Sequence, residues 1–156
     1  MRRSDREVTD FSHIKDIISR CDCLRLGLVD NNEAYIVPVN FGFEIKQGNR
    51  LVLYFHSATE GRKAKLLLEQ KYITFEMDTK HELVEADIAC GFSYLYQCVM
   101  GKARVEILRD NEKRKHGLNM IMSHYSKQNS WEYNEKMLDR VLVVELSVTE
   151  LCCKEH

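Results

Sequence analysis

The segment from His56 to Lys63 (His56-Ser57-Ala58-Thr59-Glu60-Gly61-Arg62-Lys63) gathers groups that bind anions. It follows a strongly apolar stretch and precedes a run of good helix formers, so it should end a strand and begin a helix. A helix N-terminus offers unpaired backbone N–H groups, to which Ser57 adds a hydroxyl and Arg62 and Lys63 add charge. Gly61 lets the backbone approach a ligand closely. The pattern predicts a phosphate-binding turn, and the plain alternative is an ordinary helix start.

His56 opens this segment, where its imidazole could hydrogen-bond a ligand or donate a proton. The alternative is a satisfied histidine at the end of a strand. The six histidines are scattered, and no Gly-x-Ser-x-Gly elbow or cysteine-protease signature accompanies them. The segment also lacks a Walker A loop and a Gly-x-Gly-x-x-Gly fingerprint, so neither a nucleotide triphosphatase nor a Rossmann enzyme is indicated.

A second group of residues suits a flat aromatic ligand. Aromatic side chains alternate along residues 34–44, while Pro38 and Asn40 interrupt the other face of that stretch. Pro38 cannot donate to a ladder and indicates an edge, a bulge or an opening in the sheet. Asn40 in the middle of an apolar strand predicts a buried amide that needs partners. Trp131, the only tryptophan, lies in a polar break between helices and either covers this groove or anchors the last helix.

The six cysteines do not form a recognisable framework. A disulfide scaffold requires a small secreted chain in an oxidising compartment, which this sequence does not resemble. The spacings Cys21-x-Cys23 and Cys152-Cys153 are also wrong for a zinc knuckle. We therefore expect reduced thiols and no metal site.

Hydrophobic spacing and turn signals predict the elements that position these residues. Helices are expected after Asp10, after Gly61 and after Asp110, with a short helical segment at 135–138. The acidic, aperiodic stretch 78–89 is expected to be a surface loop. Six strands are expected, at 24–28, 34–44, 50–56, 72–77, 94–108 with a bulge at Gly101, and 141–148. Because strands and helices do not alternate regularly, the pattern favours a mainly β fold, a small antiparallel barrel with peripheral α-helices.

Length and composition agree with one ordinary globular domain spanning 1–156. The charges nearly cancel, with 23 Lys and Arg against 24 Asp and Glu, so nucleic acid is not an expected partner. No apolar run approaches the ~20 residues that span a bilayer, so no membrane partner is expected. The first residues run into acids rather than an apolar signal segment, which predicts a cytoplasmic protein.

Several ordered motifs together resemble the pyridoxamine 5′-phosphate oxidase-like flavoproteins, in particular their nitroimidazole-resistance branch. The motifs are Tyr35-Ile36-Val37-Pro38-Val39-Asn40-Phe41-Gly42-Phe43, then Leu53-Tyr54-Phe55-His56-Ser57-Ala58-x-x-Gly61-Arg62-Lys63, and Phe75-Glu76-Met77-Asp78. The opening Met1-Arg2-Arg3-x-Asp5-Arg6-Glu7 and the later Tyr96-x-x-Val99-x-Gly101-x-Ala103 are also similar. The resemblance implies a six-stranded antiparallel split β-barrel, the FMN-binding split barrel, that works as a homodimer with FMN between the subunits.

The resemblance also assigns residues to the cofactor. It implies that Pro38, Val39 and Asn40 lie along the isoalloxazine ring. It implies further that His56, Ser57 and Ala58 lie near the ribityl chain, and that Gly61, Arg62 and Lys63 bind the phosphate. Gln97 and Cys98 depart from the pattern, because many relatives have Arg and Ser there, and the departure removes one charge and one hydroxyl.

The function implied is an FMN-dependent oxidoreductase. It would pass electrons from a reduced nicotinamide or another donor to a small aromatic or nitroaromatic acceptor, with His56 as the candidate catalytic residue. Two alternatives stay open. One is a non-catalytic flavin- or haem-binding module, for which His56, His124 and Cys98 are the plausible haem ligands. The other is an oxidase of a pyridoxal-type substrate, which ranks last because the C-terminus lacks a second basic motif.

Overall fold

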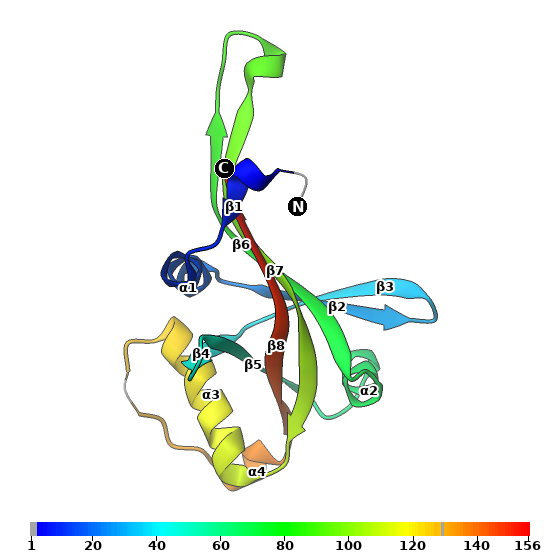
Figure 1. Cartoon of the computed structure of the whole chain (residues 1–156). Helices are drawn as coiled ribbons and strands as arrows, with labels where there is room; N and C mark the ends of the chain where they lie inside the picture. The colour runs from blue at the N-terminus through cyan, green and yellow to red at the C-terminus, as the bar shows by residue number, and fades with distance from the viewer. Residues whose placement is uncertain (1–2, 129) are drawn as a thin grey trace.

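Eight strands form one antiparallel sheet in the computed structural model, which describes residues 3–128 and 130–156 (Figure 1). The strand order is β3-β2-β6-β7-β8-β5-β4, and the short β1 pairs with β8 outside this path. The strands are β1 (Glu7–Val8), β2 (Leu24–Asp30), β3 (Glu33–Val39), β4 (Gly42–Lys46), β5 (Arg50–Ala58), β6 (Tyr72–Val84), β7 (Ser93–Leu108) and β8 (Val141–Glu155). Met1 and Arg2 of the opening motif lie outside the described residues, as does Asn129.

The predicted class, mainly β with peripheral helices, is confirmed, but the expected number of six strands is wrong. Two differences account for the change. The stretch expected as one strand from 34 to 44 is divided into β3 and β4 by a break at Asn40 and Phe41, and β1 was not expected. Since β3 and β4 stand at opposite ends of the strand order, the sheet is not closed. The break is where the chain leaves one edge for the other.

The helices lie around this sheet as α1 (Phe11–Arg20), α2 (Arg62–Glu69), α3 (Asn111–Tyr125) and the short α4 (Glu135–Leu138). The predicted caps are confirmed, because Asp10 accepts a hydrogen bond from Ser12 N and Asp110 accepts one from Lys113 N. Two single-turn 3-10 helices, Ser4–Arg6 and Ala89–Gly91, complete the set.

The main core fills the inner face of the sheet. The predicted apolar stripe of α1 is buried there, with Ile17 and Ile18 fully inaccessible. Alternate residues of the neighbouring strands meet them, among them Leu26, Phe55 and Met77. Period-two alternation of apolar residues is what a half-buried strand requires, and it explains why the sequence predicted these elements.

A smaller core lies on the outer face of β5 and β8, under α3. Tyr54 and Val143 are buried beneath this helix beside Ile121. Gly42 is required for the fit, because a Cβ atom there would overlap the α3 backbone at Met120. The glycine therefore lets α3 approach β4 without an intervening side chain.

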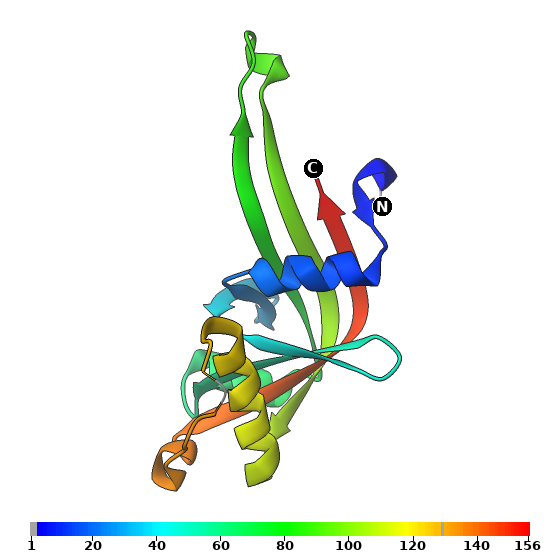
Figure 2. The same cartoon turned by 90° about the vertical axis from the view of Figure 1, so that its left-hand side faces the viewer.

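The loop expected at 78–89 is confirmed only for residues 85–88, because β6 continues to Val84 and pairs with the start of β7. The pairing shifts register between Thr79 and Glu82, and beyond that shift the two strands form a ribbon that projects from the body (Figures 1 and 2). Both faces of this ribbon meet solvent, so its sequence does not show the alternation from which strands are predicted.

The bulge expected in β7 at Gly101 is wrong, because the nearby irregularity belongs to the neighbouring strand β8. The β7–β8 ladder shifts between Lys102 and Ala103, and the unpaired residue, Thr149, belongs to β8. Gly101 is needed for a different reason: a Cβ atom there would overlap the Phe75 ring and the carbonyl oxygen of Glu150.

The two residues that depart from the family pattern point to different sides of β7. Gln97 is buried, accepts a hydrogen bond from Arg20 (3.0 Å) and donates one to Glu155 (2.9 Å), so it ties α1 to β7 and β8. The Cys98 thiol lies 3.5 Å from Glu76 on the other face. All six cysteines are free thiols. None of the helices in the described part of the chain has the length and apolar character needed to span a bilayer.

Candidate functional site

The turn between β5 and α2 has the predicted strand-to-helix geometry. β5 ends at Ala58, and α2 begins at Arg62 with Gly61 as its N-cap. Gly61 has φ of 100°, a conformation that side chains other than glycine adopt with strain. No atom would obstruct a Cβ there, so glycine is needed for its conformation and not for space. The turn leaves the first N–H groups of α2 without a side-chain cap.

Positive charge accumulates at this helix start. Arg62 and Lys63 occupy the first turn of α2, which contains no acidic residue. The helix dipole adds a partial positive charge at the same end, so both side chains stand where a cation is least favourable. An anion bound at this position would relieve that repulsion.

Arg62 is held in place by the β2–β3 hairpin. Its Nε donates to Asp30 Oδ2 (2.6 Å), and its guanidinium lies 4.2 Å from the centre of the Tyr35 ring. Within the described residues, no partner engages its terminal Nη donors. The contact with Asp30 was not predicted, because Asp30 lies in a turn and its sequence neighbours do not indicate a role at this site.

Lys63 lies beside His56 with its charge uncompensated. Burial lowers the pKa of Lys63, and among the residues that the structure describes no carboxylate pairs with its ammonium group. Burial, and then the nearby charge of Lys63, lower the pKa of His56. The imidazole is therefore neutral near pH 7, with one ring nitrogen as a donor and the other as an acceptor. The structure thus brings His56, Arg62 and Lys63 to one region.

His56 also borders a cavity of about 380 Å³ under the segment that precedes α4. Leu118 of α3, Tyr133 and Met137 are among its lining residues. Trp131 is half-buried and lies just before this segment, but its ring is not part of the lining. Its indole Nε1 is buried and finds no hydrogen-bond acceptor within the described part of the chain.

The other residues predicted for the site differ in their exposure and in the strands that carry them. Ser57 is buried next to the turn, whereas Ala58 is exposed. Val39 packs against the main core, and Pro38 lies exposed on the edge strand β3, opposite Arg25. The edge position expected for Pro38 is confirmed.

Asn40 is exposed, which corrects the expectation of a buried amide. It lies in the break between β3 and β4, where the backbone leaves the sheet. The β4–β5 ladder ends at Gly42 and Tyr54, two residues short of the position at which Asn40 would oppose His56. Asn40 therefore lies beyond the end of the β4–β5 ladder.

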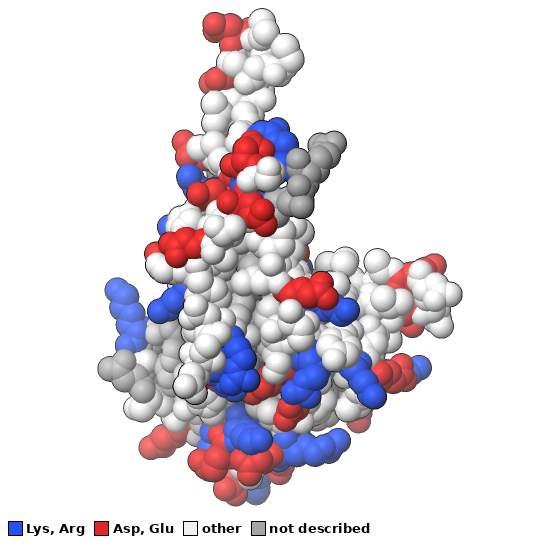
Figure 3. Space-filling model, viewed as in Figure 1, with Lys and Arg blue, Asp and Glu red and all other residues white. Residues whose placement is uncertain are grey.

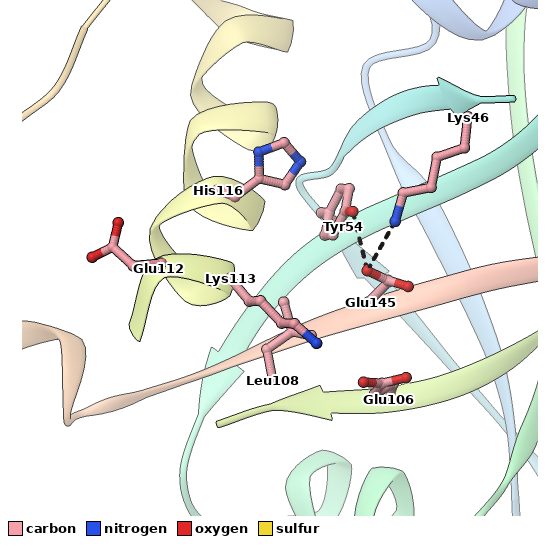
Figure 4. A pocket seen from close by; sticks show the side chains of 8 residues that line it. All are labelled: Lys46, Tyr54, Glu106, Leu108, Glu112, Lys113, His116 and Glu145. Atoms are coloured by element: carbon pink, nitrogen blue, oxygen red, sulfur yellow. Dashed lines mark hydrogen bonds and ion pairs between the residues drawn. The ribbon is translucent and has the colours of Figure 1, made fainter. Parts of the chain in front are cut away.

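A second polar cluster surrounds Tyr54, whose phenol donates to Glu44 Oε1 (2.5 Å). The same phenol lies 3.1 Å from Glu145 Oε2 (Figure 4). Lys46 Nζ is 3.5 Å from Glu145, and His116 Nε2 is 3.2 Å from Glu44. Burial raises the pKa of Tyr54, as do the two carboxylates. Burial alone would raise the pKa of Glu44, but its hydrogen bonds, chiefly from Tyr54, outweigh this and lower it.

This cluster ties α3 to three strands around a cavity of about 370 Å³. This cluster was not predicted from the sequence. One signal was available, since Glu145 interrupts the otherwise apolar stretch from Val141 to Leu146. We assign the cluster a structural role, because its polar groups satisfy one another.

Comparison with known proteins places the chain in a family. The family model described as pyridoxamine 5′-phosphate oxidase matches residues 11–155. A structure from Bacteroides thetaiotaomicron VPI-5482, assigned to 5-nitroimidazole antibiotic resistance, superposes with a TM-score of 0.83 at 29% identity, over 96% of this chain and 86% of that chain. Comparison with curated proteins gives no match.

Two further solved structures share the fold at lower identity. The flavocytochrome Anf3 from Azotobacter vinelandii has a TM-score of 0.81 at 23% identity, over 100% of this chain and 72% of that chain. The FAD and haem binding protein from Mycobacterium smegmatis has a TM-score of 0.81 at 18% identity, over 96% and 73%. With the family model matching nearly all of the sequence, the resemblance seen in the motifs is confirmed, and the chain belongs to the pyridoxamine 5′-phosphate oxidase family.

Proposed function

We propose that the chain binds FMN and acts as an oxidoreductase on small aromatic or nitroaromatic acceptors, with a reduced nicotinamide or another donor supplying electrons. The observation that carries the proposal is the uncompensated positive charge at the start of α2. Lys63 is partly buried without a described carboxylate partner, and Arg62 keeps its Nη donors unused. A phosphate monoester would supply the missing negative charge and accept from both side chains.

The residues present fit a phosphorylated flavin. Arg62, Lys63 and the uncapped N–H groups of α2 would hold the phosphate, while Asp30 and Tyr35 fix the direction of the Arg62 guanidinium. A bound flavin supplies hydride and electron transfer. The protein contributes binding and orientation, and the glycine at position 61 keeps the backbone amides accessible.

His56 is the proposed catalytic residue. Its lowered pKa keeps the imidazole neutral, so a ring N–H can donate a hydrogen bond or a proton while the other nitrogen accepts one. Leu118 and Met137 line the cavity beside this ring, and His56 itself is exposed at the surface.

The names of the relatives support a flavin without deciding which one. The Mycobacterium smegmatis neighbour is described as binding FAD and haem, and the Azotobacter vinelandii neighbour is a flavocytochrome. We favour FMN because one helix start offers one phosphate site. We also propose that the protein is a homodimer, since an open sheet of this size leaves apolar side chains on its outer face that a second subunit would cover.

The absorbance spectrum of the freshly purified protein tests the proposal, because it separates flavin, haem and cofactor-free protein. The expected result is a flavin spectrum, with FMN identified by chromatography of the released cofactor and with reduction of a nitroimidazole at the expense of a reduced nicotinamide. A variant combining Arg62→Ala with Lys63→Ala should lose the flavin, while the control combining Lys65→Ala with Lys71→Ala should keep it. A haem spectrum alone, or unchanged FMN affinity in the first variant, would overturn the proposal.

A further inference from the structure

The cavity beside His56, which we call the His56 cavity, has a make-up that the phosphate assignment does not use. Its volume is about 380 Å³, and its walls include apolar side chains from α3, α4 and β8, namely Leu118, Met137 and Val141. Ligand sites in proteins have volumes of this order and combine apolar walls with a few polar groups that fix orientation. A single substituted ring fits such a space, whereas a whole dinucleotide does not.

Hydrogen bonds hold the segment that covers this cavity, residues 132–138, against α3. The Tyr133 phenol donates to Asn119 Oδ1 (2.8 Å), and the Arg114 guanidinium donates to the carbonyl oxygen of Leu138. The Arg114 side chain is only 11% exposed. A site whose walls are fixed before a ligand arrives loses less conformational freedom on binding. The cavity is therefore preformed in the chain.

Two side chains at the cavity are left without the contacts that their chemistry favours. The His56 imidazole is neutral, and no described residue forms a hydrogen bond with it, so its donor nitrogen and its acceptor nitrogen are both unused. Met137 is 60% exposed although it borders the cavity. A ring placed between them would cover the methionine and engage the imidazole.

Glu132 gives the cavity a negative charge. It is exposed, and of the described residues that line the cavity it alone is charged at neutral pH. Lys63 lies near His56 but is not among these lining residues, and the phosphate of a bound flavin would neutralise it. Figure 3 shows positive and negative side chains intermingled over the lower half of the molecule, so no broad field of one sign outweighs Glu132 on the face that it shows. A cationic ligand is therefore favoured over an anionic one.

We propose that the His56 cavity binds the electron acceptor and selects a single aromatic ring that carries a cationic side chain. The ring would pack between Leu118 and Met137, with a polar substituent accepting a hydrogen bond from His56 and the cationic side chain lying toward Glu132. The inference rests on the proposed function for the role of the ligand as acceptor. It goes beyond that function by naming the residues that bind the ring and the charge that they prefer.

Three nitroimidazoles that share one ring and differ in a single side chain test the preference for charge. The side chain ends in an ammonium, a hydroxyl or a carboxylate group, and equilibrium dialysis against the protein as purified measures each dissociation constant without requiring turnover. The ammonium compound should bind about fivefold more tightly than the carboxylate compound, and added salt should reduce the difference. Glu132→Gln should remove the difference. The control Glu135→Gln removes an equal charge from the first turn of α4 and should keep it.

Met137→Ala tests the apolar wall, with Met122→Ala as its control. Both methionines are exposed, so the fold should persist in both variants. Met137→Ala should raise the dissociation constants of all three compounds about fivefold, because the ring loses an apolar contact. It should also raise the KM for the acceptor more than it changes kcat, as expected of a contact made equally in the bound and reacting states. Met122 does not line the cavity, and its replacement should change neither constant.

Equal affinity of the wild type for the ammonium and carboxylate compounds would overturn the inference, as would a wild type that binds none of the three. The same holds if Met137→Ala behaves like its control, even where flavin binds and a nitroimidazole is reduced. If the compounds bind with the expected preference but no reductant transfers electrons to them, the proposed oxidoreductase fails and the assignment of the cavity stands.

Discussion

Replacing Lys63 with glutamine tests separately how its charge affects the stability of the flavin-free protein and the affinity for FMN. The change keeps a polar side chain, one atom shorter, while removing one of two positive charges from the first turn of α2. Because no described carboxylate pairs with Lys63, the flavin-free protein should not lose stability. Relief of the repulsion with the helix dipole should instead stabilise it by about 0.3–1 kcal/mol.

The same substitution should weaken FMN binding. A hydrogen bond between a charged donor and a phosphate oxygen contributes about 1.5–3 kcal/mol. Its loss corresponds to a dissociation constant that is roughly 10- to 150-fold higher. Arg62 would remain, oriented by Asp30, so binding should be reduced and not abolished.

A fluorescence titration with FMN measures the affinity, and urea denaturation of the flavin-free protein measures the stability. Lys65→Gln is the control, because it makes the same change of charge at an exposed position of the same helix. Lys63→Gln with unchanged FMN affinity, or with a loss of stability clearly greater than that of the control, would refute the reasoning.

Four further predictions concern other parts of the structure. Gly42→Ala should lower the free energy of unfolding by about 3 kcal/mol or prevent folding, because its methyl group would overlap the α3 backbone. Gly48→Ala is the control, since Gly48 lies in open space with a φ of 78° and its replacement should cost about 1 kcal/mol. Equal costs in urea denaturation would contradict this. Tyr54→Phe should cost about 1–3 kcal/mol, because two carboxylates lose their shared donor, and an unchanged midpoint would show that the cluster contributes nothing. Because the pKa of His56 is lowered on folding, the wild type should lose stability as the pH falls below the ordinary histidine value of about 6.5. His56→Gln should lose less stability over the same range. Parallel curves of unfolding free energy against pH between pH 7.5 and 5 would contradict the lowered pKa of His56. If Trp131 covers the flavin, FMN should quench the tryptophan emission, and Trp131→Phe should bind FMN more weakly at an unchanged melting temperature. A Trp131→Phe variant with normal FMN binding and a much lower melting temperature would instead show that Trp131 anchors the core.

Local rules predicted the elements whose residues bury one face. The helix after Asp10 and the strands of the main core were found because apolar residues recur at the period of the element. The ends of β6 and β7 were missed for the converse reason, since solvent on both sides of their ribbon leaves no alternation of apolar and polar residues. The break at Asn40 was missed because the apolar residues on either side keep the same alternation while the chain passes from one edge of the sheet to the other.

The candidate site also combines residues that the sequence predicts with residues that it does not. The turn before α2 and its cations are contiguous in sequence, so they were predicted. Asp30, Tyr133 and Met137 reach the site through tertiary packing, and their own sequence neighbours carry no signal of it. Burial, and then the nearby charge of Lys63, lower the pKa of His56, and both effects depend on how α2 packs against the end of β5.

The phosphate assignment is the central claim, and a paired titration of the flavin-free protein with FMN and with riboflavin tests it most directly. The two ligands share the ring and the ribityl chain and differ only in the phosphate. FMN should bind roughly tenfold or more tightly than riboflavin, and Arg62→Ala combined with Lys63→Ala should remove this preference. Equal affinity for the two ligands in the wild type, or a preference that survives in the double variant, would contradict it.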